Sequence, residues 1–476
     1  MQVLYAPPHA SSKAVRERHG GRGGAQLTTL VGAGKAIVTP AHPVTLSGFA
    51  ARTQVSQGVA DQLYARALAL GGERPSAPAL VVSIDAIGVD SAFTAALRAR
   101  LADIVPPERV AVVASHTHGG PALLDGAELG EVDPGVRRGF LLGAEAAARQ
   151  AVAAMASATL HYDVVTVPGL ARNRRAAAGP VDDELTVLWA ERGEGEVVAL
   201  LASFALHPVV LGPDNLLITR DYVGYVVDGL EAAFPGALAL FATGCAGQIN
   251  HGHGAEESFA LTASSKRTYA VAQAIGRRLA QAAEAAVHQR RKPALRTPSV
   301  SVARDIVQLP LSRHSELGEA SGAATPELLS NIELALREAH SNEDHAAVAL
   351  LEPQVRWAKL NSKAPPSEAA ACRSTEVMAL GLGELVIALL PGEPFVEYGL
   401  NLKAQIVACY PSVKAVIPVG YANDAPGYLP TAAAVAEGGY EVYLAYRFYG
   451  LPSRYSEGVE SALEGAAARL VKLVIR

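Results

Sequence analysis

Five polar segments of this chain each follow a short apolar run that is typical of a buried β-strand. The segments are Ser115–Pro121, Leu206–Pro208, Gly244–Asn250, Pro391–Pro394 and Asn423–Tyr428. Each of them carries a polar side chain that can bind a metal ion. In α/β proteins the ends of several buried strands meet at one place, and ligand sites form there. We therefore expect an α/β (mixed α+β) fold, with buried mixed sheets flanked by helices and a metal site at the strand ends.

The first segment contains two histidines, His116 and His118, in the sequence Ser-His-Thr-His-Gly-Gly-Pro. The run before it, residues 110–114, is wholly apolar and rich in valine, as in a strand buried on both faces. Residues i and i+2 of an extended chain point to the same side, so both imidazoles can face one cavity. A hydrogen-bonded structural pair of histidines is the alternative.

His207 and Glu393 follow two further apolar runs, residues 197–206 and 385–390. A buried carboxylate without a partner is costly, so Glu393 needs a cation, which a metal ion or a neighbouring arginine would supply. A solvated turn residue is the alternative for Glu393. Taken alone, His207 is more simply explained as a hydrogen-bonded core or loop residue.

Taken together, these segments resemble the neutral/alkaline non-lysosomal ceramidases, which are zinc amidases that cleave N-acylsphingosine. The resemblance extends to the pair Asn173-Arg174, to Asp221–Tyr225 after His207-Pro208, and to Tyr440-Glu441 near the C-terminus. The order of the motifs agrees throughout, and Tyr428 and Tyr440 stand 12 positions apart (440 − 428), as the family pattern requires. The similarity runs from about Gly34 to Gly450 and implies the fold of the ceramidase catalytic domain.

The resemblance also implies roles for seven residues. It places Zn²⁺ ligands at His116, His207, Glu393 and Tyr428, and catalytic residues at His118, Arg174 and Tyr440. Imidazole, carboxylate and phenolate groups are acceptable zinc ligands, and an open position keeps a water whose pKa falls to about 7. The three catalytic residues would offer donors to the oxyanion that forms when zinc-bound hydroxide attacks a carbonyl.

Two differences from the ceramidases bear on the substrate. Gly247-Gln248-Ile249-Asn250-His251 replaces a Gly-Asp-Val-Ser-Pro-Asn type segment, so an amide stands where the family has an acid. Ceramidases also continue into an immunoglobulin-like domain of about 100 residues, whereas this chain ends at Arg476 soon after the last motif. We expect a short or moderately sized N-acyl or peptide-like amide to be preferred to long-chain ceramide.

The function expected from the sequence is thus a zinc-dependent hydrolase that cleaves a linear amide. An esterase or lactonase with the same zinc site and a true ceramidase are alternatives among enzymes. A non-catalytic metal- or ligand-binding protein is the alternative of another class. The presence of His118, Arg174 and Tyr440 favours an enzyme, because a binding protein has no need of oxyanion donors.

We divide the sequence into a flexible N-terminal arm, residues 1–30, and one hydrolase domain, residues 31–476. Within the domain, residues 314–364 are polar and helical, and form either a solvated helical pair or a lid. Further apolar runs predict strands at 79–85, 237–242 and 414–419, and Thr325-Pro326 predicts a helix start. Helices are expected at 269–288 and 457–475. The last should bury one face, made of Val459, Leu463, Ala466, Leu470 and Leu473.

Composition limits the partners and the compartment. Half of the residues are hydrophobic, which is enough for a large core, and the net charge of −5 gives no basic footprint for nucleic acid. The arm has no apolar core of a signal peptide, and no apolar run reaches the ~18 residues of a transmembrane helix. Three widely spaced cysteines fit a reducing compartment, so we expect a cytoplasmic protein with a small-molecule amide substrate. Homo-oligomerisation stays open.

Two other residues near the expected site have simple structural explanations. Cys245 is expected to be a small buried hydrophobe rather than a nucleophile. Asp85 ends an apolar run, and is expected to cap that strand rather than to orient a zinc-binding histidine.

Overall fold

The structure of the protein is a computed structural model that describes residues 29–72, 77–124, 129–255, 257, 264–289, 293–297, 299–312, 324–361 and 372–475. Most of the N-terminal arm, residues 1–28, lies outside this part, and so do residues 313–323 and 362–371 at the ends of the predicted helical insertion. The first strand begins at Thr29.

In its described residues the chain forms two large mixed sheets and three small two-stranded ones. The eight-stranded sheet has the order β11 (Leu238–Thr243), β9 (Glu196–Phe204), β8 (Glu184–Arg192), β6 (Ala156–Thr166), β1 (Thr29–Ile37), β3 (Tyr64–Gly71), β4 (Ala79–Ile84) and β5 (Val110–Ala114). The four-stranded sheet has the order β13 (Ser301–Pro310), β14 (Cys372–Leu382), β15 (Leu385–Leu389) and β17 (Ala415–Val419). The small pairs are β2 (Gly58–Val59) with β10 (Leu217–Ile218), β7 (Arg172–Asn173) with β12 (Ile249–Asn250), and β16 (Glu393–Pro394) with β18 (Tyr428–Leu429).

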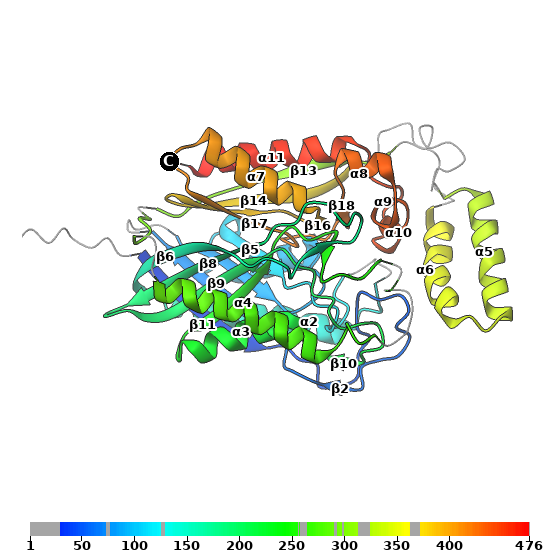
Figure 1. Ribbon diagram of the computed structural model, residues 1–476, viewed down its shortest axis with the longest axis horizontal. Helices are drawn as coiled ribbons and strands as arrows, with labels where there is room; N and C mark the ends of the chain where they lie inside the picture. The colour runs from blue at the N-terminus through cyan, green and yellow to red at the C-terminus, as the bar shows by residue number, and fades with distance from the viewer. Residues whose placement is uncertain are drawn as a thin grey trace, which may run out of the picture.

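The described residues form eleven α-helices. They are α1 (Ser91–Leu101), α2 (Pro134–Ala153), α3 (Asp221–Ala233), α4 (Tyr269–Gln289), α5 (Pro326–Ser341), α6 (His345–Asn361), α7 (Val396–Cys409), α8 (Ala432–Glu437), α9 (Tyr440–Tyr443), α10 (Ala445–Phe448) and α11 (Gly458–Val474), with a 3₁₀ turn, η1, at Pro107–Arg109. Figure 1 shows α7 and α11 over the four-stranded sheet, and α2, α3 and α4 on the far side of the eight-stranded sheet. The fold is therefore a four-layered α/β arrangement, which confirms the expected fold class.

Burial on both faces explains why the strands read as continuous apolar runs. In β15, Leu385, Ile387 and Leu389 join the core between the two sheets. The alternating residues Val386 and Ala388 join the core under α7 and α11. Because neither face meets water, no polar residue interrupts the strand, and the period-2 pattern of a half-exposed strand is lost.

Most elements expected from the sequence are present. β4, β5, β9, β11, β15 and β17 coincide with the predicted strands, and α4 and α11 with the predicted helices. The buried face of α11 was wrong in one position, because Leu473 is 62% exposed while Val471 and Val474 are buried. The helix drifts relative to a strict repeat, which brings Val471 and Val474 to the core in place of Leu473.

The expected helical insertion is a pair of helices, α5 and α6, and Thr325 caps α5 by accepting a hydrogen bond from Leu328 N. In Figure 1 the pair stands at one end of the molecule, with α6 facing α9 and α10. Trp357 of α6 donates to Leu451 O (2.7 Å) and packs against Tyr446, and Gln354 accepts from Arg447. These contacts fix α6 to the segment that carries Tyr440.

In the described part of the chain, none of the helices has the length and apolar composition that crossing a membrane requires.

Candidate metal centre

The expected site residues come from the ends of three large-sheet strands. His116 follows β5, His207 follows β9, and Glu393 follows β15 after a turn in which Gly392 has a φ of 58°. Glu393 begins β16, which pairs in parallel with β18, so that Glu393 and Tyr428 are direct register partners. Residues far apart in the sequence are thereby brought to one point, as the strand-end pattern predicted.

His116 does not continue strand β5. Its φ is 65°, a conformation that side chains rarely adopt, and its N–H donates to Ala86 O (2.9 Å). The expectation of an extended His116–His118 segment is therefore wrong, because β5 ends at Ala114 and the chain turns. The two imidazoles nevertheless lie together, with ring centroids 5.1 Å apart. The turn at His116, which the β4–α1 loop holds through Ala86 O, thus brings the two imidazoles together, as the extended geometry was expected to do.

His116 and His207 direct the same ring nitrogen toward each other. Their Nε2 atoms are 2.8 Å apart, while His116 Nδ1 contacts Ile87 O and His207 Nδ1 contacts Ala246 O. A carbonyl only accepts, so each Nδ1 carries a proton and donates it, and a ring that carries only that proton presents a lone pair at Nε2. Two facing lone pairs repel one another. A cation between the rings would relieve this repulsion.

Glu393 adds an anionic oxygen to the two imidazoles. Its Oε2 lies 3.2 Å from His116 Nε2 and 3.5 Å from His207 Nε2, and it has no hydrogen-bond partner among the described residues. Its other oxygen accepts a hydrogen bond from Tyr449. The side chain is only 2% exposed. An unpartnered carboxylate oxygen in so buried a position again calls for a cation.

Tyr428 completes the arrangement on the side of β18. It is buried, its ring is stacked with that of His207 at 6.5 Å, and the guanidinium of Arg174 lies 5.4 Å from its ring centre. Burial, and then the charge of Glu393, raise the pKa of Tyr428 well above its usual value, while Arg174 opposes the shift. Ionisation of this phenol therefore depends on a nearby positive charge, which a bound metal would provide.

His118 lies in the same cluster. One ring nitrogen from each of His116, His118 and His207 can be chosen so that the three nitrogens lie within 4.8 Å of one another. Within the described residues, neither His118 ring nitrogen has a hydrogen-bond partner. Burial, and then the charges of His116 and nearby arginines, lower the pKa of His118 well below its usual value. The ring is therefore neutral at neutral pH and can bind either a metal or a substrate.

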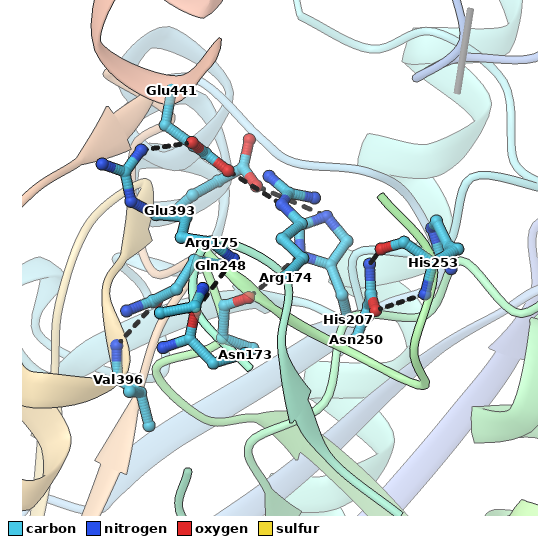
Figure 2. Close-up of polar contacts among 12 residues, drawn as sticks. Asn173, Arg174, Arg175, His207, Gln248, Asn250, His253, Glu393, Val396 and Glu441 are labelled. Carbon is cyan, nitrogen blue, oxygen red and sulfur yellow. Dashed lines mark hydrogen bonds and ion pairs between the residues drawn. The ribbon is translucent and has the colours of Figure 1, made fainter. Parts of the chain in front are cut away.

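Arg174 and Tyr440 both lie next to Tyr428, and the rings of Tyr440 and Tyr428 have centroids 5.9 Å apart. Arg174 Nε donates to Glu441 Oε1 (2.8 Å), and the guanidinium lies 5.9 Å from the ring centre of Tyr440. Figure 2 shows Arg174 between His207 and Glu441. Arg175 donates to the other oxygen of Glu441. One nitrogen of Arg174, Nη2, has no partner in the part of the chain that the structure describes. The ion pair with Glu441 thus leaves this nitrogen unused.

The structure adds residues that sequence reasoning missed. Tyr449 donates to Glu393, and Glu441 holds both Arg174 and Arg175. Tyr421 stacks on His116 with ring centroids 4.1 Å apart, and its buried hydroxyl has no described partner. The adjacency of Glu441 to Tyr440 was a usable signal. No spacing or composition in the sequence distinguishes Tyr421 or Tyr449 from other tyrosines of the core.

Gln248 and Asn250 do not present their amides to a substrate. Gln248 donates to Glu397 Oε2 (2.7 Å) and accepts from Val396 N (3.0 Å), as Figure 2 shows. Asn250 donates to His253 O and accepts from the N–H groups of Gly252 and His253. Both side chains are at most 1% exposed. The hydrogen-bonding groups of both side chains fix the loops around β12.

Asp85 and Cys245 have the structural roles expected for them. Asp85 Oδ2 accepts from Tyr64 N (2.8 Å) at the end of β4. Cys245 is 1% exposed and belongs to the core, and burial raises the pKa of its thiol. Such a thiol is a poor nucleophile.

A cavity of about 170 Å³ opens beside Tyr440. Its walls include Phe49 and Arg52 from the loop after β1, Tyr440 from α9, and Glu352 and Arg356 from α6. Polar and apolar groups contribute about equally to this lining. The helical insertion therefore forms one wall of the space from which a substrate would reach Tyr440.

Comparison with known proteins confirms the resemblance to ceramidases. Residues 29–240 match the family model described as neutral/alkaline non-lysosomal ceramidase, N-terminal. The neutral ceramidases of Drosophila pseudoobscura pseudoobscura and Drosophila melanogaster are each 26% identical, over 234 and 231 residues, which is 44% of this chain. The matched region spans about a third of the length of these curated relatives (33% and 32%).

Solved structures extend the similarity to nearly the whole chain. The neutral ceramidase from Pseudomonas aeruginosa matches with a TM-score of 0.71 and 18% identity, over 95% of this chain and 76% of that one. A ceramidase complexed with C2 matches with the same TM-score and coverage and 17% identity. His116, His118, Arg174 and His207 lie within the region of sequence similarity. For Glu393, Tyr428 and Tyr440 the similarity is one of fold.

Proposed function

We propose that this chain, which is similar to the neutral ceramidases in sequence and fold, is a zinc-dependent hydrolase of an N-acyl amide bond. One observation carries the proposal: the Nε2 lone pairs of His116 and His207 and the unpartnered Oε2 of Glu393 converge at 2.8–3.5 Å. Ligand atoms about 2.0–2.2 Å from a tetrahedral zinc are separated by about 3.3–3.6 Å. The separations of 3.2 and 3.5 Å from Glu393 are close to this value, and the two imidazoles, 2.8 Å apart, would have to move apart by about 0.5 Å to hold the metal.

We assign the metal to His116, His207, Glu393 and Tyr428, and keep His118 for the substrate. His116 and His207 have their tautomer fixed by a backbone carbonyl on Nδ1, which is the usual arrangement of a metal-binding histidine. His118 has no such partner in the described chain. Its ring is therefore not fixed as a ligand. It stays available to hold or donate a proton beside the scissile bond.

When bound, zinc polarises a carbonyl and lowers the pKa of a coordinated water. The chain's own residues supply the rest of the chemistry. Arg174 Nη2 and the Tyr440 hydroxyl are donors for the negative oxygen of a tetrahedral intermediate, and Glu441 holds Arg174 in place. Because burial lowers its pKa, His118 is neutral and can accept the proton that the attacking water gives up, and then pass that proton to the leaving amine.

For the substrate we propose a short or moderately sized N-acyl amide. A cavity of about 170 Å³ with mixed lining suits an acyl group of a few carbons beside polar atoms, rather than a long hydrocarbon chain. A true ceramidase with a longer path for the lipid is the competing assignment. Cleavage of an oxygen ester at the same centre is a second competing assignment, since the same donors can bind the carbonyl oxygen of an amide or of an ester.

Metal analysis and a substrate panel test the proposal together. Purified protein should contain about one zinc per chain and should hydrolyse N-acyl amino compounds faster than matched esters, relative to their uncatalysed rates. Chelation should abolish turnover, and added zinc should restore it. Stoichiometric zinc without hydrolysis of any amide or ester would instead identify a binding protein.

A further inference from the structure

His118 is held in a close-fitting position by the loop that follows β1. A Cβ atom added to Gly48 would lie 2.2 Å from His118 Nδ1, and Gly48 has a φ of 99°. The ring of Phe49 lies 4.7 Å from that of His118 at an angle of 53°. Only glycine therefore fits at position 48, and the Phe49 ring bounds the movement of the imidazole on one side.

Arg52 connects this loop to the backbone of His118. Its Nη1 donates to His118 O (2.7 Å) and Ser47 O (3.3 Å), and its Nη2 donates to Gly212 O (3.3 Å). Its guanidinium also lies 4.9 Å from the centre of the Phe49 ring. One buried arginine thus ties together the Phe49 loop, the His118 turn and the loop that follows His207-Pro208.

A second arginine, Arg267, braces the same ring. Its guanidinium lies 5.4 Å from the Phe49 centre, and its Nη2 donates to Val209 O and Leu211 O (both 3.2 Å). Arg52 and Arg267 are each only 6% exposed. Two cations facing one aromatic ring favour a fixed ring position, since both are attracted to its electron-rich face.

We propose that Phe49 and Arg52 act on turnover by positioning the imidazole of His118, although both also stand in the wall of the cavity beside Tyr440. This inference rests on the proposed function, in which His118 acts on the substrate. A binding site for an anionic substrate group at Arg52 is the competing explanation of its charge. The contacts disfavour it, because both terminal nitrogens donate to carbonyls and Nε is shielded from solvent.

The test compares Arg52→Met and Phe49→Ala with a matched control, Arg192→Met. Arg192 also donates its Nη2 to two carbonyls, Val31 O and Ala154 O, and also has a buried Nε without a described partner. Arg192 is the last residue of β8 and pairs with Glu196 at the start of β9. His207 follows the other end of β9, so Arg192 lies away from the site. Loss of stability alone should therefore affect Arg52 and Arg192 variants alike.

We expect Arg52→Met and Phe49→Ala to lower kcat by about 10–100-fold, since a misplacement of about 1 Å costs about that much. KM and zinc content should change less than about threefold, and Arg192→Met should keep the wild-type kcat. Arg52→Lys should recover part of the loss, because an ammonium can still donate to His118 O. Gly48→Ala should behave as Phe49→Ala does. A tenfold rise in KM for an anionic substrate in Arg52→Met, absent for a neutral one, would support the competing anion site and overturn the proposal.

A double-mutant cycle identifies the residue through which Arg52 acts. In a His118→Ala background, Arg52→Met should lower the residual hydrolysis of an activated aryl ester no further. Losses that multiply would overturn the proposal. Histidine-selective ¹⁵N labelling gives a readout independent of turnover: the His118 ring signal should shift or broaden in Arg52→Met and not in Arg192→Met. If the wild type hydrolysed nothing, the proposed function would fail, while the ring signal would still test the positioning.

Discussion

Glu393 and Tyr428 are register partners in a two-stranded parallel ladder, although 35 positions (428 − 393) separate them in the sequence. Glu393 N donates to Gly427 O (2.9 Å), and Phe395 N donates to Leu429 O. The backbone therefore fixes two proposed ligands side by side before any metal binds. Such preorganisation lowers the conformational entropy that binding must otherwise remove.

Replacing either histidine ligand should remove the metal. Each of His116→Ala and His207→Ala loses one of the two Nε2 atoms proposed to bind the metal, so zinc content should fall below about one tenth per chain. Zinc at 100 times its Kd should stabilise the wild type by about 2.7 kcal/mol and these variants not at all. Metal analysis and thermal unfolding with and without zinc measure both effects. Full zinc occupancy in either variant would show that the ligand assignment is wrong.

Tyr449 should matter for metal affinity rather than for catalysis. Its hydroxyl donates to Glu393, so Tyr449→Phe leaves a buried carboxylate oxygen with no protein donor among the described residues. Loss of such an outer contact typically weakens metal binding by about 10–100-fold. Tyr162→Phe is the control, because Tyr162 likewise donates to a glutamate, Glu384 (2.9 Å), away from the centre. Competition with a chromogenic chelator should detect weaker zinc binding in Tyr449→Phe alone.

Tyr440 should have the opposite profile. Tyr440→Phe removes a proposed oxyanion donor and should keep full zinc, while turnover falls by about 10²–10³. Tyr443→Phe, at the other end of α9 and 45% exposed, should be indistinguishable from wild type. Steady-state kinetics with parallel metal analysis distinguish the two roles. Wild-type turnover in Tyr440→Phe would remove it from the mechanism.

These predictions depend on features that the sequence revealed only in part. Apolar runs located the strands because burial on both faces excludes polar residues, and the ordered motifs located His116, His207, Glu393 and Tyr428. The turn at His116 could not be inferred, since its φ of 65° is imposed by Ala86 and other residues distant in sequence. For the same reason, the contact of Tyr449 with Glu393 and the inward-facing hydrogen bonds of Gln248 become visible only in three dimensions.

Stability should depend on pH through Asp221. Burial raises the pKa of this carboxyl from 3.8 to about 6, against the hydrogen bonds that it accepts. The folded state therefore holds the proton more tightly than the unfolded state, so stability is lost as pH rises from about 4 to 6. The loss amounts to about 3 kcal/mol at 1.36 kcal/mol per unit. Asp221→Asn lacks this titration, so its free energy of unfolding relative to wild type should rise by about that amount between pH 4 and pH 7. A pH-independent difference in urea titrations would contradict the assignment.

The choice between a soluble amide and ceramide is decided at the cavity beside Tyr440. The polar residues Glu352 and Arg356 of α6 stand in its wall, where a long hydrocarbon chain would have to desolvate them. Catalytic efficiency should therefore be higher on soluble N-acyl amino compounds with acyl chains of a few carbons than on ceramide in detergent micelles. Removing both charges in Glu352→Leu/Arg356→Leu should shift the preference toward longer acyl chains, because the wall becomes apolar. Lys359→Leu, also exposed on α6 but paired with Glu333, is the control that should leave chain-length preference unchanged. A clear preference of the wild type for ceramide would overturn the substrate assignment while leaving the metal centre intact.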